Sequence, residues 1–274
     1  MIDFNFKYKK VLEKINLEKP FKPVLSIVLG SGLGNFADKV NVIKSIPTAE
    51  IEDYPKSTVE GHKGFIHFAE YNNVNLILFQ GRIHLYEGYS ISDSILPVFI
   101  SKEVGCKYIL LTNAAGGIHP NLSPGSLMLI ESVNGISIKK ELTELLGLAT
   151  IETKNRMLNF PSKSFNKIIE QSAIEIKFPL KHGTYWFSKG PTYETPSEIK
   201  MAERLGADSV GMSTVHEAVF AMKLGLEVSG ISLISNWAAG ISNTPLSHQE
   251  VVETANLVNE KFTELVKQII KNII

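Results

Sequence analysis

The segment Val24-Leu25-Ser26-Ile27-Val28-Leu29-Gly30-Ser31-Gly32-Leu33-Gly34 is a short apolar run that ends in a glycine-rich loop. Its length and its branched apolar side chains are typical of a buried strand, which we expect over Val24–Leu29. Similar apolar runs alternate with amphipathic stretches along the rest of the chain. This alternation predicts an α/β fold in which helices flank a twisted β-sheet.

Five further runs are predicted strands: Leu76–Phe79, Tyr108–Thr112, Leu127–Ile130, Ser209–Met212 and Val228–Ile234. Gly64–Glu70 and Val74–Gln80 flank the turn residues Tyr71-Asn72-Asn73, which predicts an antiparallel hairpin and therefore a mixed sheet. No internal repeat, low-complexity stretch or linker rich in proline and glycine interrupts the sequence. We therefore expect a single domain over residues 1–274.

Two helices have clear sequence patterns at their starts. Thr195-Pro196-Ser197-Glu198 combines an N-cap, a proline at the first helical position and a capping-box glutamate. That helix is predicted to run to Leu205, with Gly206 just beyond its end. Ser247-His248-Gln249-Glu250 is a second capping box. The helix after it has an apolar face with steps of three and four residues: Val251, Ala255, Val258, Phe262, Leu265, Ile269 and Ile273.

Composition argues against several classes of function. Lys+Arg and Asp+Glu both total 28, so the net charge is zero and no long-range basic field would gather nucleic acid or an anionic membrane. Cys106 is the single cysteine, which leaves neither an intramolecular disulfide nor a Cys-x-x-Cys zinc site. Signal-peptide and membrane-spanning patterns are missing from the sequence. We expect a cytoplasmic protein with no metal, no nucleic-acid partner and no membrane contact.

Unusual polar or small-residue clusters stand where the predicted strands end. The clusters are Gly30–Gly34, Gln80–His84, Asn113–Gly117, Ser213-Thr214 and Asn236. In open α/β sheets, ligands bind in the crevice at the carboxyl ends of the strands. Five such clusters therefore predict one composite site.

The first cluster could bind phosphate, because Gly30–Gly34 offers backbone N–H groups and the hydroxyl of Ser31. It does not match the dinucleotide fingerprint, since Asn35 stands where a glycine is required. It does not match a nucleotide P-loop either, because no Gly-Lys-Ser/Thr follows. Taken alone, this loop is explained equally well as a plain turn between a strand and a helix.

Arg82 and His84 lie two residues apart in Gly81–Tyr89, so both face the same side of an extended segment. The planar arginine fork and a histidine donor suit phosphate oxygens. His62, in Gly61-His62-Lys63-Gly64, is either a further donor or a surface turn residue. The small side chains of Asn113–Gly117 would either let a ligand reach a backbone N–H or form a close-packed turn.

Two other side chains suit a heteroaromatic base. Glu194, in Gly190–Pro196, lies just before a predicted helix. Its carboxylate would either interact favourably with the positive end of the helix dipole or accept a hydrogen bond from a base N–H. Asn236 can donate and accept, which suits a heteroaromatic edge with an acceptor next to a donor. A turn asparagine is the alternative interpretation of Asn236.

Together these segments resemble the trimeric family of purine nucleoside phosphorylases, of the 6-oxopurine type. The resemblance covers most of the chain, over Leu29–Asp38, Gly61–Gly64, Gly81–Tyr89, Thr112–Gly117, Gly183–Leu205, Gly206–Thr214 and Ile231–Gly240. The Gly190–Pro196 motif and Gly211-Met212-Ser213-Thr214 are highly specific to that family. The resemblance implies an α/β fold around a mixed sheet, a homotrimer, and a pocket near a subunit interface.

The resemblance also implies roles for individual residues. Phosphate would be bound by Ser31, His62, Arg82, His84, the Ala114 backbone and Ser213. The purine would lie against Tyr193, Glu194, Val210, Met212 and Asn236. The ribose would lie against Tyr86, Tyr185, Met212, His248 and, from a neighbouring subunit, Phe160. Asn236, Glu194 and His84 would be the catalytic residues.

The implied reaction is phosphorolysis of inosine, guanosine and their deoxy forms, with inorganic phosphate as co-substrate and no cofactor. Asn236 at N7 and Glu194 near N1 and O6 would stabilise the departing base as negative charge develops on it. The site of the related methylthioadenosine phosphorylases resembles this one but has an aspartate in place of Asn236. The alternatives are therefore a methylthioadenosine or xanthosine phosphorylase and, outside the enzymes, a nucleoside-binding protein without turnover.

One region departs from the family pattern. Residues 133–140 read Val-Asn-Gly-Ile-Ser-Ile-Lys-Lys, where the family carries a run like Asn-Pro-Leu-x-Gly-Pro-Asn. A leucine-rich stretch that we expect to be helical follows, and Phe160-Pro161 again resembles the family. The altered run predicts a different loop at this place, next to the expected subunit contact.

Overall fold

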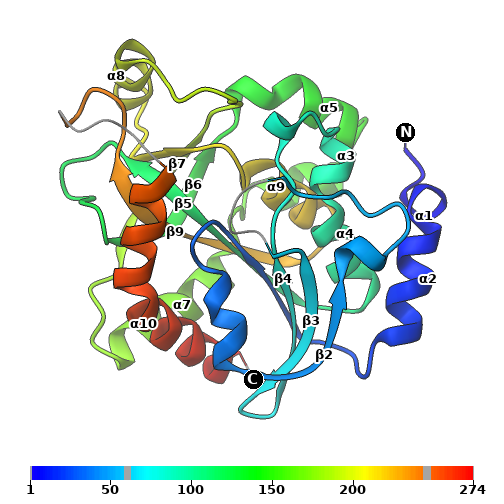
Figure 1. Cartoon of the computed structure of the whole chain (residues 1–274). Coiled ribbons are helices and arrows are strands. Elements are labelled where there is room, and N and C mark those ends of the chain that lie inside the picture. The colour runs from blue at the N-terminus through cyan, green and yellow to red at the C-terminus, as the bar shows by residue number, and fades with distance from the viewer. Residues whose placement is uncertain (1, 59–62, 243–247, 274) are drawn as a thin grey trace.

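The computed structural model of the chain describes residues 2–58, 63–242 and 248–273, and of residues 248 and 249 only the backbone (Figure 1). In this part of the chain, nine strands form one sheet in the order β2-β3-β4-β1-β5-β8-β7-β6-β9. The strands are β1 (Leu25–Leu29), β2 (Asn41–Pro47), β3 (Phe65–Tyr71), β4 (Val74–Gln80), β5 (Tyr108–Gly117), β6 (Leu127–Asn134), β7 (Lys181–Phe187), β8 (Ser209–Gly211) and β9 (Glu227–Trp237).

The sheet is mixed and partly closed. β1 runs parallel to β4 and β5, whereas β3 is antiparallel to β2 and β4. β9 pairs with β6 and also returns to pair with β5. β5, β8, β7, β6 and β9 therefore close into a small barrel, from which β1, β4, β3 and β2 extend as an open wing. The predicted mixed α/β fold is confirmed, and the closure of the barrel adds to it.

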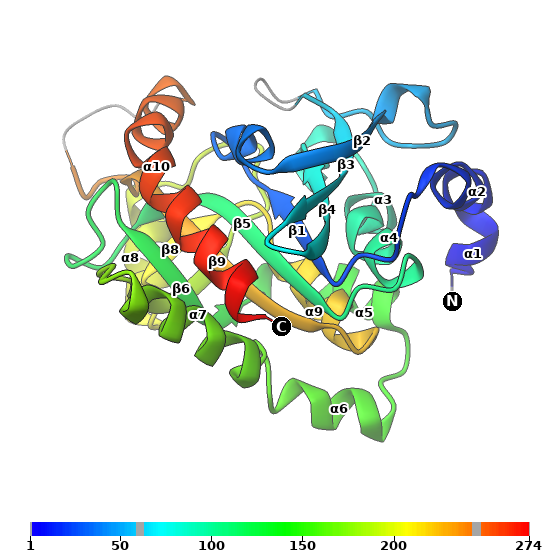
Figure 2. The same cartoon turned by 90° about the horizontal axis from the view of Figure 1, so that it is seen from below.

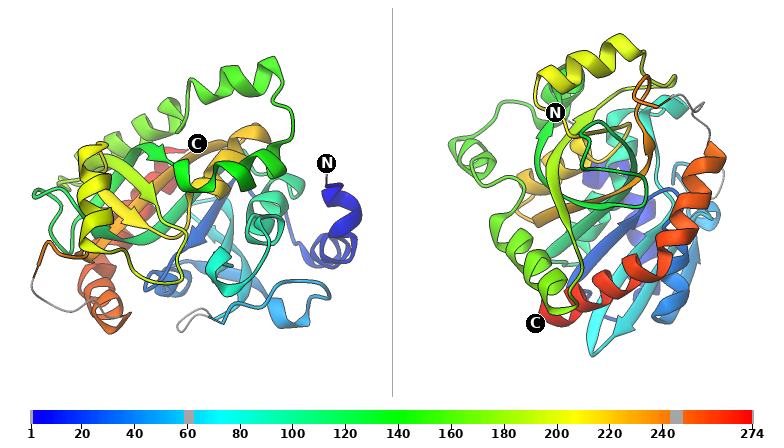
Figure 3. Two further views of the ribbon diagram at one scale, coloured as in Figure 1. Left: turned by 90° about the horizontal axis from the view of Figure 1, so that it is seen from above. Right: turned by 90° about the vertical axis from the view of Figure 1, so that its left-hand side faces the viewer.

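Helices cover both faces of the sheet. The α-helices are α1 (Phe4–Lys7), α2 (Lys9–Glu18), α3 (Ile91–Ser94), α4 (Leu96–Glu103), α5 (Lys139–Leu146), α6 (Ile151–Met157), α7 (Lys163–Glu175), α8 (Pro196–Arg204), α9 (Val215–Lys223) and α10 (His248–Asn272). Short 3₁₀ helices lie at η1 (Gly34–Lys39), η2 (Thr48–Glu50), η3 (Leu85–Glu87) and η4 (Ile136–Ile138). α7 and α10 lie side by side on one face, and α4 and α9 cover the other (Figure 3).

Side chains alternate between the two apolar cores along each central strand. On β5, Ile109 and Leu111 join the core under α4 and α9, whereas Tyr108 and Leu110 join the core under α7 and α10. A strand buried on both faces reads as a continuous apolar run, because neither set of alternate positions meets water. This is why the central strands were predictable from short apolar runs.

The predicted hairpin and the predicted helix after Thr195 are both confirmed. Asn72 and Asn73 connect β3 to β4 with φ of 52° and 62°, the left-handed pair that a two-residue hairpin turn requires. At α8 the backbone N–H of Glu198 donates to Thr195 Oγ1 at 3.3 Å, and Gly206 follows the helix with φ of 80°. The second capping box begins at Ser247, which lies outside the described residues.

Three predicted strand ends were wrong, and two strands were missed. β6 continues past Ile130 to Asn134. β5 continues to Gly117 and β9 to Trp237, so the small-residue cluster and Asn236 are strand residues and not turns after strands. They stay extended because β5 and β9 pair along this whole length. β2 and β7 were not predicted because each begins with an exposed polar residue and neither is apolar along its whole length.

The segment that departs from the family pattern forms the end of β6, then η4, α5 and α6. The predicted leucine-rich helix is confirmed as α5. α6 lies at the periphery of the molecule (Figure 2), and three apolar side chains in and beside it, Leu148, Ile151 and Leu158, are at least 78% exposed. Among the described residues, no helix has the length and apolar character needed to cross a membrane.

Candidate active site

A cavity of about 300 Å³ lies where β1, β4, β5, β8 and β9 end. It is lined by Ser31, Arg82, His84, Tyr86, Asn113, Ala114, Ala115, Gly116, Pro191, Tyr193, Glu194, Val210, Gly211, Met212, Ser213, Ser235, Asn236, Ala238 and Val251. All five clusters predicted from the strand ends contribute to this lining, so their convergence on one site is confirmed.

Arg82 is the most deeply buried charged group of the cavity, with 1% of its surface exposed. Its Nε lies 3.0 Å from the carboxylate of Glu217, which is fully buried. Its Nη1 donates to the carbonyl of Thr112 at 2.8 Å and to Ser213 Oγ at 3.4 Å. These contacts hold the guanidinium in one orientation, because planar hydrogen-bond geometry restricts its rotation.

His84 lies beside Tyr86, with the two rings stacked at a centroid separation of 4.6 Å. Its Nδ1 is 3.1 Å from Glu87 Oε1. Burial lowers the pKa of His84, against the opposing effect of Glu87, so the imidazole is neutral at pH 7. With Nδ1–H directed at Glu87, the neutral ring presents Nε2 as an acceptor, and it becomes a donor there only when an anion stabilises the imidazolium.

The first glycine loop approaches β5 closely. The N–H of Gly30 donates to Thr112 Oγ1 at 3.1 Å, and a Cβ atom at position 30 would lie 2.5 Å from the Thr112 carbonyl oxygen. Only glycine allows this approach. The packing brings Ser31 to the same cavity wall as Ala114.

Glu194 and Tyr193 come from the segment between β7 and α8. Glu194 lines the cavity, and its buried Oε1 has no hydrogen-bond partner among the described residues. Tyr193 is 48% exposed and lines the mouth of the cavity. Gly190 has φ of 69°, and a Cβ there would meet Met212 Sδ at 2.8 Å, so this segment packs tightly against Met212.

Asn236 is positioned by an irregularity in β9. The pairing of β9 with β5 shifts register between Ala115 and Gly116, which leaves Ser235 as the extra residue before Asn236. Such a bulge changes the direction of the side chains that follow it. Ser235 Oγ donates to Asn236 Oδ1 at 2.6 Å, and Asn236 Nδ2 donates to the Trp237 carbonyl at 2.9 Å.

One predicted ligand contact, Tyr185, lies outside the lining of the cavity. Tyr185 is fully buried beneath the cavity, where its hydroxyl accepts from the N–H of Ser213 at 3.3 Å. It supports the floor of the site and does not line it, in contrast to its predicted place beside the ribose. Phe160 packs half-buried against the main apolar core, and its contact with a neighbouring subunit stays a prediction. His62 and the side chain of His248 lie outside the described part of the chain.

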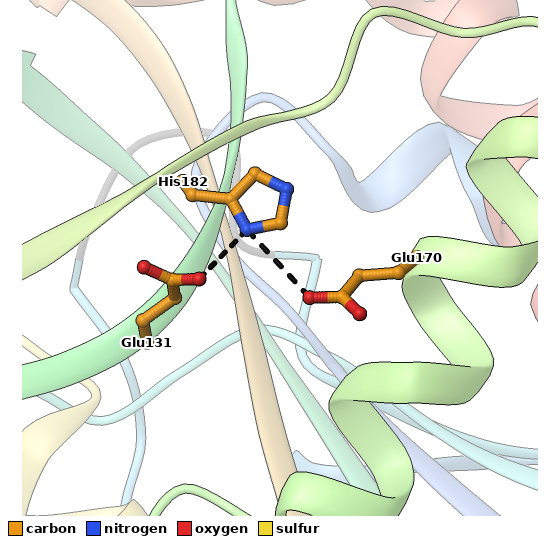
Figure 4. A group of neighbouring side chains, drawn as sticks. All are labelled: Glu131, Glu170 and His182. Carbon is orange, nitrogen blue, oxygen red and sulfur yellow. Dashed lines mark hydrogen bonds and ion pairs between the residues drawn. The ribbon is translucent and has the colours of Figure 1, made fainter.

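A group of possible metal ligands lies apart from the cavity, and within the described residues it is the one such group whose ligand atoms come close together. His182 Nδ1 is 2.9 Å from Glu131 Oε1 and 3.8 Å from Glu170 Oε1 (Figure 4). All three side chains are more than one third exposed. A separation of 2.9 Å is that of a direct hydrogen bond, so the group is explained by a surface hydrogen bond between His182 and Glu131.

Sequence reasoning missed Glu217, Thr112 and Ser235, which hold the side chains of the site. Glu217 has a local pattern that could have marked it, because it stands three residues after Thr214 as in a capping box. Nothing local indicates that its carboxylate meets Arg82, which lies 135 residues away in the chain. Ser235 reads simply as part of an apolar strand.

Known proteins share this architecture over almost the whole chain. The family model of the phosphorylase superfamily matches residues 25–271. Purine nucleoside phosphorylase 1 of Geobacillus stearothermophilus is 39% identical over 258 residues, which are 93% of this chain and 93% of the relative. The purine nucleoside phosphorylase of Rattus norvegicus is 34% identical in an alignment of 280 positions, gaps included, which covers 97% of this chain and 94% of the relative.

A solved structure of Schistosoma mansoni purine nucleoside phosphorylase in complex with inosine superposes with a TM-score of 0.86 at 30% identity, covering 97% of this chain and 96% of that chain. A Schistosoma mansoni purine nucleoside phosphorylase in complex with adenosine gives a TM-score of 0.86 at 31% identity, with the same coverage. Fold and cavity thus define an α/β protein of the phosphorylase superfamily. Within that superfamily the chain belongs to the purine nucleoside phosphorylases, which are pentosyltransferases.

Proposed function

We propose that this protein uses inorganic phosphate to cleave the bond between a 6-oxopurine and ribose or deoxyribose. The products are the free base and the pentose 1-phosphate. The observation that carries this proposal is the content of a single cavity: a buried arginine with hydroxyl donors, and a buried carboxylate oxygen with an oriented amide.

The phosphate subsite is formed by Arg82, Ser31, Ser213, His84 and the backbone at Ala114, with His62 as a further ligand. The guanidinium supplies charge-assisted hydrogen bonds, which are about twice as strong as neutral ones. The chain has no net charge, so this local arrangement, and not a global field, would select the anion. A bound dianion would also raise the pKa of His84 and turn its Nε2 into a donor.

The purine subsite is formed by Glu194 and Asn236, with Tyr193, Val210 and Met212 around the ring. The strand β5 sets its distance from the phosphate subsite. The Thr112 carbonyl accepts from Arg82, and Gly116 pairs with Asn236. Thr112 and Gly116 are four residues apart on β5, which corresponds to about 13 Å at about 3.3 Å per residue. That span leaves room for a pentose between phosphate and base, next to Tyr86, His248 and a neighbouring subunit's Phe160.

In the proposed reaction a phosphate oxygen bonds to C1′ while the bond from C1′ to N9 breaks, and the bonding electrons leave with the base. Positive charge on the pentosyl group is stabilised by the phosphate anion below it. Negative charge on the base is relieved when N7 takes a proton from solvent, which balances the proton that the phosphate loses on becoming an ester, and N7–H then donates to Asn236 Oδ1. Glu194 accepts from N1–H, and the preorganised groups act where charge develops. No cofactor takes part.

The assembly and its cellular place belong to the same proposal. We infer a cytoplasmic homotrimer of one nucleoside phosphorylase domain over residues 1–274. The exposed apolar side chains of Leu148, Ile151 and Leu158 support an interface between copies, because such a cluster is unfavourable in water. Neither nucleic acid nor a membrane is expected as a partner.

The test is phosphate dependence of base release. Purified protein is incubated with inosine, guanosine, xanthosine, adenosine or methylthioadenosine, with and without phosphate, and the base and pentose 1-phosphate are quantified by chromatography. We expect hypoxanthine and guanine release that requires phosphate and is unaffected by chelators. Equal rates without phosphate would indicate a hydrolase, preference for methylthioadenosine or xanthosine would reassign the substrate, and binding without turnover would favour a nucleoside-binding protein.

A further inference from the structure

Glu217 stands on the first turn of α9 and contacts two separate parts of the phosphate subsite. Its carboxylate lies 3.0 Å from Arg82 Nε, and its Oε2 accepts the backbone N–H of Thr214 at 3.0 Å. We propose that Glu217 is a positioning residue that orients both Arg82 and the turn carrying Ser213 for phosphate. This inference rests on the proposed phosphorolysis.

The turn that carries Ser213 has an unusual backbone. Thr214 has φ of 73° and ψ of −50°, and the N–H of Val215 donates to the Ser213 carbonyl at 2.8 Å, which together make a γ-turn of positive φ. A β-branched residue avoids positive φ, so its surroundings must hold it there. Glu217 accepts from the Thr214 N–H, and Asn113 Nδ2 donates to Thr214 Oγ1 at 2.9 Å.

This turn decides where the Ser213 hydroxyl lies. Ser213 directly precedes Thr214, and its Oγ accepts from Arg82 Nη1 at 3.4 Å while lying 3.2 Å from Thr214 Oγ1. One carboxylate therefore fixes both the guanidinium and the hydroxyl, and their mutual contact closes the network. Loss of that carboxylate would loosen both donors together.

The direction in which phosphate affinity changes when the Glu217 carboxylate is removed distinguishes a positioning role from a purely electrostatic one. Glu217 carries a negative charge beside the anion subsite, so by charge alone its removal would strengthen phosphate binding. By positioning, its removal would weaken phosphate binding, because two donors lose their fixed geometry. A merely structural role would lower stability and affect both substrates alike.

Glu217→Gln tests this inference with little change in volume. Both carboxylate oxygens lie 3.0 Å from Arg82 Nε, and Oε2 also lies 3.0 Å from the Thr214 nitrogen, so the amide nitrogen of glutamine opposes a donor in either orientation. We expect calorimetry with inorganic phosphate alone to show binding weakened about tenfold, which is about 1.4 kcal/mol. The KM for phosphate should rise with it, while the KM for inosine stays within about threefold. Glu103→Gln, on the exposed end of α4, is the matched control and should change neither.

Tighter or unchanged phosphate binding in Glu217→Gln would overturn the positioning role. Equal rises in both KM values, with a lowered melting temperature, would overturn it as well by showing a structural role. If the unmodified protein binds no phosphate, the proposed function itself fails. Should Glu217→Gln not fold, Glu217→Asp keeps the charge but is one methylene too short to reach both donors, and the same weakening is expected.

Discussion

Asn236→Asp is the replacement that most directly tests which purines this site accepts. Asn236 is 8% exposed, and its amide is oriented by Ser235 Oγ on the oxygen and by the Trp237 carbonyl on the nitrogen. An amide has two N–H groups and two lone pairs. One donor and one acceptor direction are thus engaged by these neighbours, and the others serve the base.

The expected change follows from the edge of the base. A 6-oxopurine presents an acceptor at O6 and a donor at N1, whereas adenine presents a donor at its 6-position and an acceptor at N1. Aspartate keeps the acceptor for Ser235 but loses the N–H directed at O6, and leaving a buried polar group unpaired costs about 1–3 kcal/mol. An ionised aspartate can accept from a 6-amino group. We therefore expect activity on inosine and guanosine to fall, and the ratio of adenosine to inosine turnover to rise roughly tenfold, about 1.4 kcal/mol.

The assay is steady-state kinetics on adenosine and inosine at saturating phosphate, with kcat/KM compared between the unmodified protein and the variant. Asn16→Asp, on the exposed face of α2, makes the same chemical change away from the cavity and should leave the ratio unaltered. A proportional loss on both nucleosides in Asn236→Asp, with no change in their ratio, would refute the assignment of Asn236 to the base.

Three further replacements test other parts of the site and fold. Arg82→Lys keeps a charge opposite Glu217 but loses the planar fork, so we expect the KM for phosphate to rise about tenfold or more, from a loss of about 1.5–3 kcal/mol; an unaltered phosphate saturation curve would contradict this. His216 is fully buried, neither ring nitrogen has a hydrogen-bond partner among the described residues, and burial lowers its pKa to about 4 from 6.5. As pH falls from 6.5 to 4, the unfolded chain therefore gains a proton that the folded chain excludes, and the free energy of unfolding falls by on the order of 3 kcal/mol. His216→Phe should flatten the curve of melting temperature against pH. Parallel curves for the variant and the unmodified protein would contradict this role of His216. Gly30→Ala places a Cβ 2.5 Å from the Thr112 carbonyl oxygen and should lower the free energy of unfolding, measured by urea titration, by about 1–3 kcal/mol. Gly34→Ala, whose Cβ would be 3.4 Å from its nearest neighbour, is the control and should not show this loss.

Much of the architecture could be predicted because short segments carry it. Val24–Leu29 is apolar at every position except Ser26, as expected for a strand that is covered on both faces. Paired asparagines at 72 and 73 tolerate the left-handed turn of a hairpin. β2 could not be predicted in this way, because it lies at the sheet edge with most of its side chains exposed. Its apolar residues Val42, Ile43 and Ile46 neither alternate with polar ones nor form a continuous run.

By itself, the sequence determined the α/β class, the central strands and the set of chemical groups at their ends, because burial and turn preferences act over a few neighbouring residues. Only the tertiary structure decided how those groups are aimed. The bulge at Ser235 turns Asn236, the return of β9 to β5 extends both strands through the site, and Glu217 reaches Arg82 across 135 residues. These features depend on which distant surfaces meet when the sheet closes, and local sequence patterns carry no information about that meeting.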